Sequence, residues 1–202
     1  MQQNNQKRAF LERLPSSVGT IFLVTCLIII YIACMLLYPY NLFVQSPEVL
    51  QLFGENERVL RGEPYRIFSA IFIHASVVHL ASNILFLTIF GIRLEELKST
   101  PIVISVFIVS GLIGNLASII WFLVEFPINS VGSSGAVFGL LGGIYFILRG
   151  KTKHERRKAL YFLVIFFLIT IGQDINFIAH FFGLLGGISF LWLDHKYREI
   201  TN

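Results

Sequence analysis

Six stretches of apolar residues alternate with polar and charged connections along the chain. They run approximately over residues 19–38, 77–90, 101–124, 134–148, 159–171 and 175–193. A helix needs about 20 predominantly apolar residues to cross the hydrocarbon core of a bilayer. The second, fourth and fifth stretches are shorter, so they must borrow flanking residues or lie in a thinner bilayer. The pattern predicts six transmembrane helices.

Composition supports a membrane protein. The 202 residues are 55% hydrophobic and 14% charged, whereas soluble domains average about 25% charged residues. We expect an all-α, polytopic membrane bundle of six transmembrane helices spanning residues 19–194. Residues 1–18 form a cytoplasmic N-terminal segment in this interpretation, and residues 195–202 a cytoplasmic tail. The first stretch ends in Tyr38-Pro39-Tyr40, not in a small-residue cleavage site, which favours a retained helix over a removed signal peptide.

The basic residues are distributed unevenly across the predicted bilayer. In a six-helix arrangement, 13 of the 16 lie on the side of both termini: Lys7, Arg8, Arg13, Arg93, Lys98, Arg149, Lys151, Lys153, Arg156, Arg157, Lys158, Lys196 and Arg198. The positive-inside rule therefore predicts cytoplasmic termini. The cluster in the fourth loop is read as a topology signal that contacts anionic lipid, and not as a nucleic-acid site.

Four polar residues are expected at one depth of this apolar bundle. His79 and Asn83 lie near the start of the second stretch, Ser134 opens the fourth, and His180 lies near the start of the sixth. All three stretches begin on the outer side. Polar side chains are costly among hydrocarbon segments, so such a set indicates function. A serine, a histidine and further donors are the components of a serine hydrolase.

Each of these residues also has a simpler interpretation. Gly132 and Gly135 leave room for a substrate beside a nucleophilic Ser134, but Ser133 or Ser134 could equally cap a helix. His180 could act as a base or only link two helices by a hydrogen bond.

Two glycine pairs favour a meeting of Ser134 and His180. Gly135 and Gly139 follow the serine, and Gly183 and Gly187 follow the histidine. Glycines spaced four apart let two membrane helices approach closely, which would bring hydroxyl and imidazole together.

His79 and Asn83 share one helix face because they are four residues apart. Both could donate to an oxyanion together with the Ser134 backbone N–H, or they could form a buried polar pair. A metal site is a third interpretation, but the chain has no His-Glu-x-x-His helix and no cysteine cluster. Asp174 lies six residues before His180 and is expected only to solvate a turn, so a Ser–His dyad is predicted.

Several motifs together resemble the rhomboid intramembrane serine proteases of the minimal six-helix bacterial type. They are Gly-x-Ser-Gly at residues 132–135, Ala-His-x-x-Gly-x-x-x-Gly at 179–187, His-x4-His-x3-Asn at 74–83, and Gly-x-x-x-Glu at 91–95. The similarity covers about residues 60–190. It implies a multi-pass protein of the bacterial plasma membrane with transmembrane protein substrates.

The resemblance also implies residue roles. Ser134 would be the nucleophile, His180 the base, and His79 and Asn83 the oxyanion hole. His74 matches a family histidine that we do not expect to be catalytic. The site-supporting residues would be Gly132, Gly135, Phe138 and Gly183.

Two positions depart from the family pattern. Tyr65-Arg66 stands where a Trp-Arg pair is usual, and Phe138 stands where many members have a tyrosine stacked on the histidine. Stacking can persist at Phe138 without the phenol hydroxyl, which would alter the rate or its pH dependence.

The sequence thus predicts an intramembrane serine endopeptidase that needs no cofactor or metal and binds the lipid bilayer but no nucleic acid. One alternative is an inactive relative that binds transmembrane helices, although such a protein would be expected to lack Ser134 or His180. The other is a small transporter, which would favour carboxylates and broken helices through the full membrane thickness.

Overall fold

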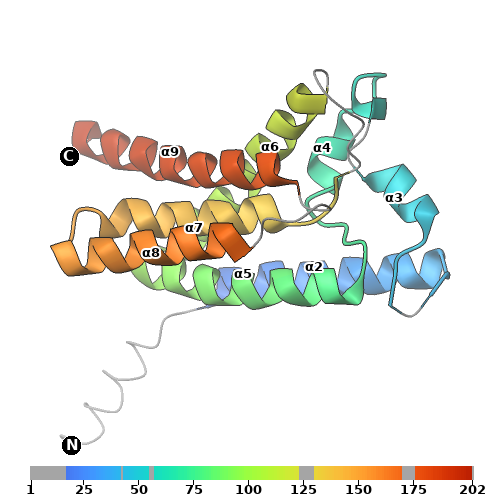
Figure 1. Ribbon diagram of the computed structural model, residues 1–202, viewed down its shortest axis with the longest axis horizontal. Helices are drawn as coiled ribbons and strands as arrows, with labels where there is room; N and C mark the ends of the chain where they lie inside the picture. The colour runs from blue at the N-terminus through green and yellow to red at the C-terminus, as the bar shows by residue number, and fades with distance from the viewer. Residues whose placement is uncertain (1–16, 42, 55–56, 123–129, 170–175, 202) are drawn as a thin grey trace, which may run out of the picture.

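The described part of the chain is built from helices joined by loops (Figure 1). The computed structural model describes residues 17–41, 43–54, 57–122, 130–169 and 176–201. The helices are α2 (Val18–Leu37), α3 (Pro47–Phe53), η1 (Glu57–Val59), α4 (Tyr65–Ser69), α5 (Val77–Leu97), α6 (Thr100–Phe122), α7 (Ser134–Leu148), α8 (Lys153–Ile169) and α9 (Phe177–Thr201). The long helices run side by side, and α3 and α4 lie at one end of the bundle, called here the α3–α4 end.

Among the described residues, four helices, α2, α5, α6 and α9, are long and apolar enough to cross a membrane. The fourth predicted stretch, α7, has the predicted bounds but only 15 residues, or about 22 Å of helix. The fifth stretch does borrow flanking residues, because α8 begins with a charged turn at Lys153. The predicted ends at residues 123–124, 170–171 and 175 lie outside the described residues, as does nearly all of segment 1–18.

Two helices extend beyond their apolar stretches. Helix α5 continues past residue 90 to Leu97, and α9 continues to Thr201 through most of the predicted tail. In α5 the added turn buries Glu95, whose carboxylate accepts the backbone N–H groups of Gly19 (2.8 Å) and Thr20 (3.0 Å). It also accepts the hydroxyl of Thr100 at 2.6 Å. Hydropathy alone ended α5 too early because this carboxylate is satisfied by hydrogen bonds.

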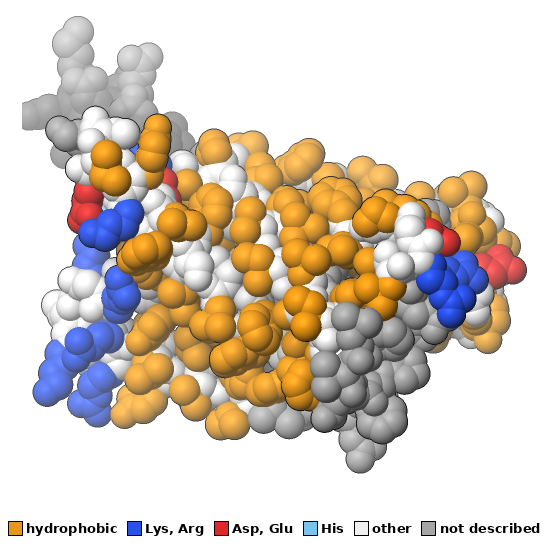
Figure 2. Space-filling view, turned by 90° about the horizontal axis from the view of Figure 1, so that it is seen from above, with side chains coloured by type: hydrophobic (Ala, Val, Ile, Leu, Met, Phe, Trp, Pro, Cys, Tyr) orange, Lys and Arg blue, Asp and Glu red, His pale blue; other side chains and the backbone are white. Residues whose placement is uncertain are grey.

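The surface matches the sequence pattern. Figure 2 shows a broad belt of apolar side chains along the bundle, with most of the visible Lys and Arg at the end opposite the α3–α4 end and a smaller group of basic and acidic side chains at the α3–α4 end. That end holds the α7–α8 connection and the C-terminal turns of α5 and α9. Its described basic residues are Arg93, Lys98, Arg149, Lys151, Lys153, Arg156, Arg157, Lys158, Lys196 and Arg198.

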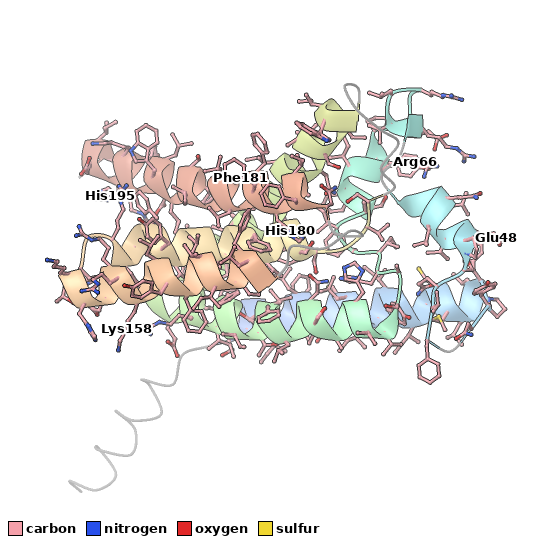
Figure 3. All side chains as sticks on the ribbon, viewed as in Figure 1. Glu48, Arg66, Lys158, His180, Phe181 and His195 are labelled. Carbon is pink, nitrogen blue, oxygen red and sulfur yellow. The ribbon has the colours of Figure 1, made fainter. Side chains whose placement is uncertain are left out.

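The α3–α4 end is organised around a buried cation, Arg66 (Figure 3). Its guanidinium donates to the carbonyls of Gln51 and Gly54 and pairs with the carboxylate of Glu63. This pairing holds the pKa of Glu63 below its usual range, chiefly through the hydrogen bond from Arg66. The described part of the long connection between α2 and α5 is therefore held together by the hydrogen bonds and the ion pair of Arg66.

Helix α7 is the central element of the bundle. Every residue from 135 to 144 is buried, and α7 packs against α5, α6, α8 and α9. Its approach to α9 is close enough to exclude side chains: a Cβ on Gly183 would overlap the carbonyl of Gly135, and one on Gly187 would overlap the carbonyl of Gly139. The glycine spacing therefore has the steric consequence expected from it.

Candidate active site

The first turns of α5, α7 and α9 meet near the α3–α4 end, and they carry the four polar residues. Ser134 begins α7, His180 is the fourth residue of α9, and His79 and Asn83 lie in the first two turns of α5. Figure 3 shows His180 on the side of the bundle nearer Arg66, away from Lys158 and His195. Ser76 fixes the start of α5, because its hydroxyl accepts the backbone N–H of His79 at 3.1 Å.

Ser134 and His180 form a direct contact. The Oγ of Ser134 lies 2.7 Å from Nε2 of His180, within the normal range for an O–H donor and a ring nitrogen. The close approach of α7 and α9 sets the distance between these two side chains. A hydroxyl that donates to an unprotonated imidazole is the arrangement of a nucleophile and its base.

Phe138 lies one turn after Ser134 and covers the imidazole of His180. The two rings are stacked, with centroids 4.5 Å apart and an interplanar angle of 23°. The other contacts of Phe138 are with Phe166 and Phe167 of α8. The aromatic stack is therefore present with a phenylalanine, without a phenol hydroxyl.

Gly132 brings the chain into contact with His79. Its φ of +118° favours glycine, and its N–H donates to the carbonyl of Ala70 at 2.8 Å. A Cβ at this position would lie 2.7 Å from the ring of His79 and 3.9 Å from Nδ2 of Asn83. Two potential donors thus flank the turn that leads into Ser134.

Asn83 is almost fully buried, and its amide already has one partner. Its Nδ2 donates to the carbonyl of His79 at 3.0 Å, one turn earlier in α5. A primary amide carries two N–H groups, so the second is available to another acceptor.

Asn176 is a site-neighbouring residue that the sequence analysis missed. Its Nδ2 donates to Ser118 Oγ at 2.6 Å and to Ser130 Oγ at 3.0 Å, and its Oδ1 accepts the Ala179 N–H at 3.0 Å. It therefore links α6, the chain before Ser134 and the start of α9. Asn immediately before an apolar helical run is a preferred N-cap, which was the available signal.

A metal ion or a third acid is the other chemistry that this part of the molecule could hold. Among the described residues, no three His, Cys, Asp or Glu side chains are grouped to hold a metal ion. Asp174, the acid considered for a triad, lies outside the described residues. Within the described part, the side-chain hydrogen bond of His180 is the one to Ser134.

Comparisons with known proteins agree with the motifs. Residues 61–197 match the rhomboid domain family. The chain is 33% identical over 153 residues to YdcA of Bacillus subtilis, covering 72% of this chain and 76% of that protein. It is 29% identical over 149 residues to rhomboid protease GluP of the same organism, covering 70% of this chain but 29% of that protein. RHOMBOID-like protein 5 of Arabidopsis thaliana is 31% identical over 150 residues, or 70% of this chain and 48% of that protein.

Proposed function

This chain belongs to the rhomboid family, and from that premise we propose that it is a serine endopeptidase that cuts transmembrane segments of other membrane proteins. The observation that carries the proposal is the 2.7 Å contact between Ser134 Oγ and His180 Nε2. The two residues come from helices that are separate in the sequence. A purely structural bond between helices would not also require the flanking donors at His79 and Asn83.

The proposed reaction proceeds through an acyl-enzyme. His180 Nε2 takes the proton of Ser134 as Oγ attacks the scissile carbonyl, and the imidazolium then gives that proton to the leaving amine. Water, deprotonated by the same imidazole, attacks the ester; the bond to Oγ breaks, the carboxyl product leaves, and the imidazolium returns the proton to Ser134 Oγ. Stacking on Phe138 keeps the imidazole plane fixed through both steps.

The negative charge of each tetrahedral intermediate needs donors beside Ser134. The backbone N–H of Ser134 at the start of α7, the ring of His79 and the remaining N–H of Asn83 fill this role in the proposal. Gly132 keeps this space open, because any side chain there would collide with the His79 ring.

The orientation follows from charge. Six helices cross the bilayer in this proposal, the basic end faces the cytoplasm with both termini, and the α3–α4 end faces outward in a bacterial plasma membrane. Helix α7 is about 22 Å long, shorter than the hydrocarbon core of about 30 Å. Ser134 then lies below the outer surface, near the outer end of a substrate helix.

A serine-directed fluorophosphonate tests the proposal. Membranes containing the protein are labelled, and the modified residue is located by mass spectrometry of peptides. Labelling at Ser134 that is lost in the His180→Ala variant is the expected result. An unlabelled protein that also fails to cleave any transmembrane substrate would overturn the proposal.

A further inference from the structure

A second serine–histidine contact lies directly beside the first. Ser133 Oγ is 3.2 Å from Nε2 of His74, while the next residue, Ser134, contacts His180. Ser133 is 0% and His74 1% exposed, so neither can reach a substrate. The two consecutive serines therefore differ in what they can do, and the buried pair requires an explanation of its own.

The hydrogen bonds of His74 define its tautomer. Nδ1 lies 3.2 Å from the carbonyl oxygen of Phe72, which can only accept, so Nδ1 carries the proton. Burial lowers the pKa of His74 to about 3, which keeps the ring neutral. Nε2 is then an acceptor with one lone pair.

Both polar groups of Ser133 are directed at that lone pair. The backbone N–H donates to His74 Nε2 at 3.4 Å, and the hydroxyl contacts it at 3.2 Å. Ser133 occupies the N-cap position of α7, yet its side chain makes no capping bond. The capping role that the sequence allowed for this serine is replaced by the contact with His74.

One short segment holds the whole turn. Residues 70–74 supply the carbonyl of Ala70 for the Gly132 N–H and the imidazole of His74 for Ser133. His74 also packs edge-on against His79, with ring centroids 5.1 Å apart. The same imidazole thus contacts both the residue before Ser134 and a proposed oxyanion donor.

We propose that His74 is a positioning residue for the oxyanion turn, acting through Ser133. This inference rests on the proposed protease function and adds to it the device that aims the Ser134 N–H. By holding the N–H and the hydroxyl of Ser133, His74 fixes the Gly132–Ser133 peptide plane and the side chain of Ser133, and so limits the rotation of the following peptide, which carries the Ser134 N–H. It also withdraws the Ser133 N–H from the oxyanion, which leaves Ser134, His79 and Asn83 as donors.

The test measures kcat and KM for a transmembrane substrate with the full-length protein in liposomes. Rates are divided by the fraction of active sites titrated with a fluorophosphonate, and thermal unfolding is recorded in parallel. The variants are Ser133→Ala, His74→Ala, the double variant, and His74→Gln, whose amide oxygen can replace Nε2 as an acceptor. Thr20→Ala is the matched control, because it removes a buried hydroxyl bond to Glu95 at the opposite end of the bundle.

A misplacement of about 1 Å in a catalytic array costs about 100-fold in rate. We therefore expect His74→Ala to lower kcat by about 10- to 100-fold with little change in KM, as for an interaction that acts in the transition state. Ser133→Ala should lose less, because its N–H remains. The double variant should match His74→Ala, His74→Gln should recover part of kcat, and Thr20→Ala should lower only the unfolding temperature.

Three outcomes decide against the inference. One is an unchanged kcat per titrated site in both His74→Ala and Ser133→Ala. Another is a Ser133→Ala loss that persists in full in the His74→Ala background, since the two residues would then act separately. If His74→Ala does not fold, Ser133→Ala carries the test, and unchanged kcat in that variant overturns the inference. A wild-type protein that neither cleaves nor becomes labelled overturns the protease proposal itself.

Discussion

Phe138 and His180 form a stacked pair, and Phe138 also packs against two phenylalanines of α8. The ring centroids of Phe138 and His180 are 4.5 Å apart, and those of Phe138 and Phe166 are 4.7 Å apart. The imidazole therefore lies against the ring of Phe138, which is itself packed against Phe166 and Phe167. The orientation of the His180 imidazole toward Ser134 depends on this aromatic packing as well as on α9.

Replacing Phe138 with leucine should reduce catalysis moderately. An aromatic pair contributes about 0.5–1.5 kcal/mol beyond its buried area, which corresponds to about a 2- to 12-fold lower kcat. Phe138→Tyr keeps the stack and should retain most of the activity. Steady-state kinetics of both variants provide the measurement, and equal loss in the two would argue that the stack is not what matters.

Ser134→Ala and His180→Ala should each abolish proteolysis and leave a folded membrane protein. A nucleophile and its base act as a unit, so the double variant should be little worse than either single one. Cleavage of a transmembrane substrate and thermal unfolding are measured together. Substantial turnover by Ser134→Ala would remove it as nucleophile, and complete loss of activity in Ser133→Ala together with an active Ser134→Ala would point to its neighbour.

Asn83→Ala should slow cleavage without abolishing it. Loss of one oxyanion donor costs about 100- to 1,000-fold in kcat, and the Ser134 N–H and His79 remain. The measurement is the rate at saturating substrate. Ser82→Ala is a suitable control, since the Ser82 hydroxyl also donates to the His79 carbonyl but is exposed. A wild-type rate for Asn83→Ala would exclude it from the site.

Gly183→Ala should separate α7 from α9 and cost both activity and stability. The added Cβ would overlap the carbonyl of Gly135, so His180 must move away from Ser134. Overpacking typically costs about 1–3 kcal/mol, and a shift of about 1 Å lowers the rate about 100-fold. Gly150→Ala is the matched control, because its Cβ would approach no atom closer than 3.8 Å. Equal kinetics for the two variants would contradict the close-approach argument.

Both termini should be cytoplasmic. A reporter fused after Asn202 should behave as cytoplasmic, and one inserted between α6 and α7 should behave as external, as the distribution of Lys and Arg requires. Enzymatic reporters active on only one side of the membrane provide the measurement. The opposite pattern would contradict the charge argument and the six-helix arrangement together.

The sequence alone placed His79, Asn83, Ser134 and His180 at one end of the bundle, because each falls in the first turns of a helix that starts on the same side. Helix α7 also has the predicted bounds, since its apolar run ends at a basic cluster. These features depend on spacing and hydropathy, which a single sequence displays directly.

Other features depend on partners that are distant in the sequence. Hydropathy ended α5 at residue 90, and the Gly-x-x-x-Glu motif at 91–95 was the local indication that the helix continues; neither pattern indicates that Glu95 is buried against residues 19 and 20. Likewise, the sequence marks His74 only as a motif residue, because its contact with Ser133 spans 59 positions. Asn176 has a local capping signal in the sequence, but nothing near it in the sequence indicates its hydrogen bonds to Ser118 and Ser130.

The carboxylate of Glu95 has a consequence for biosynthesis. Helix α2 emerges from the ribosome long before α5, and until Glu95 arrives its first N–H groups must be bonded by water or lipid headgroups. In the finished protein Gly19 and Thr20 donate to Glu95, 76 and 75 positions later, and Thr20 is 1% exposed. An unsatisfied backbone group in hydrocarbon costs several kcal/mol, so α2 cannot settle at this depth alone. The first turn of α2 therefore reaches its final hydrogen-bonded state only after residue 95 has been synthesised and α5 has packed against it.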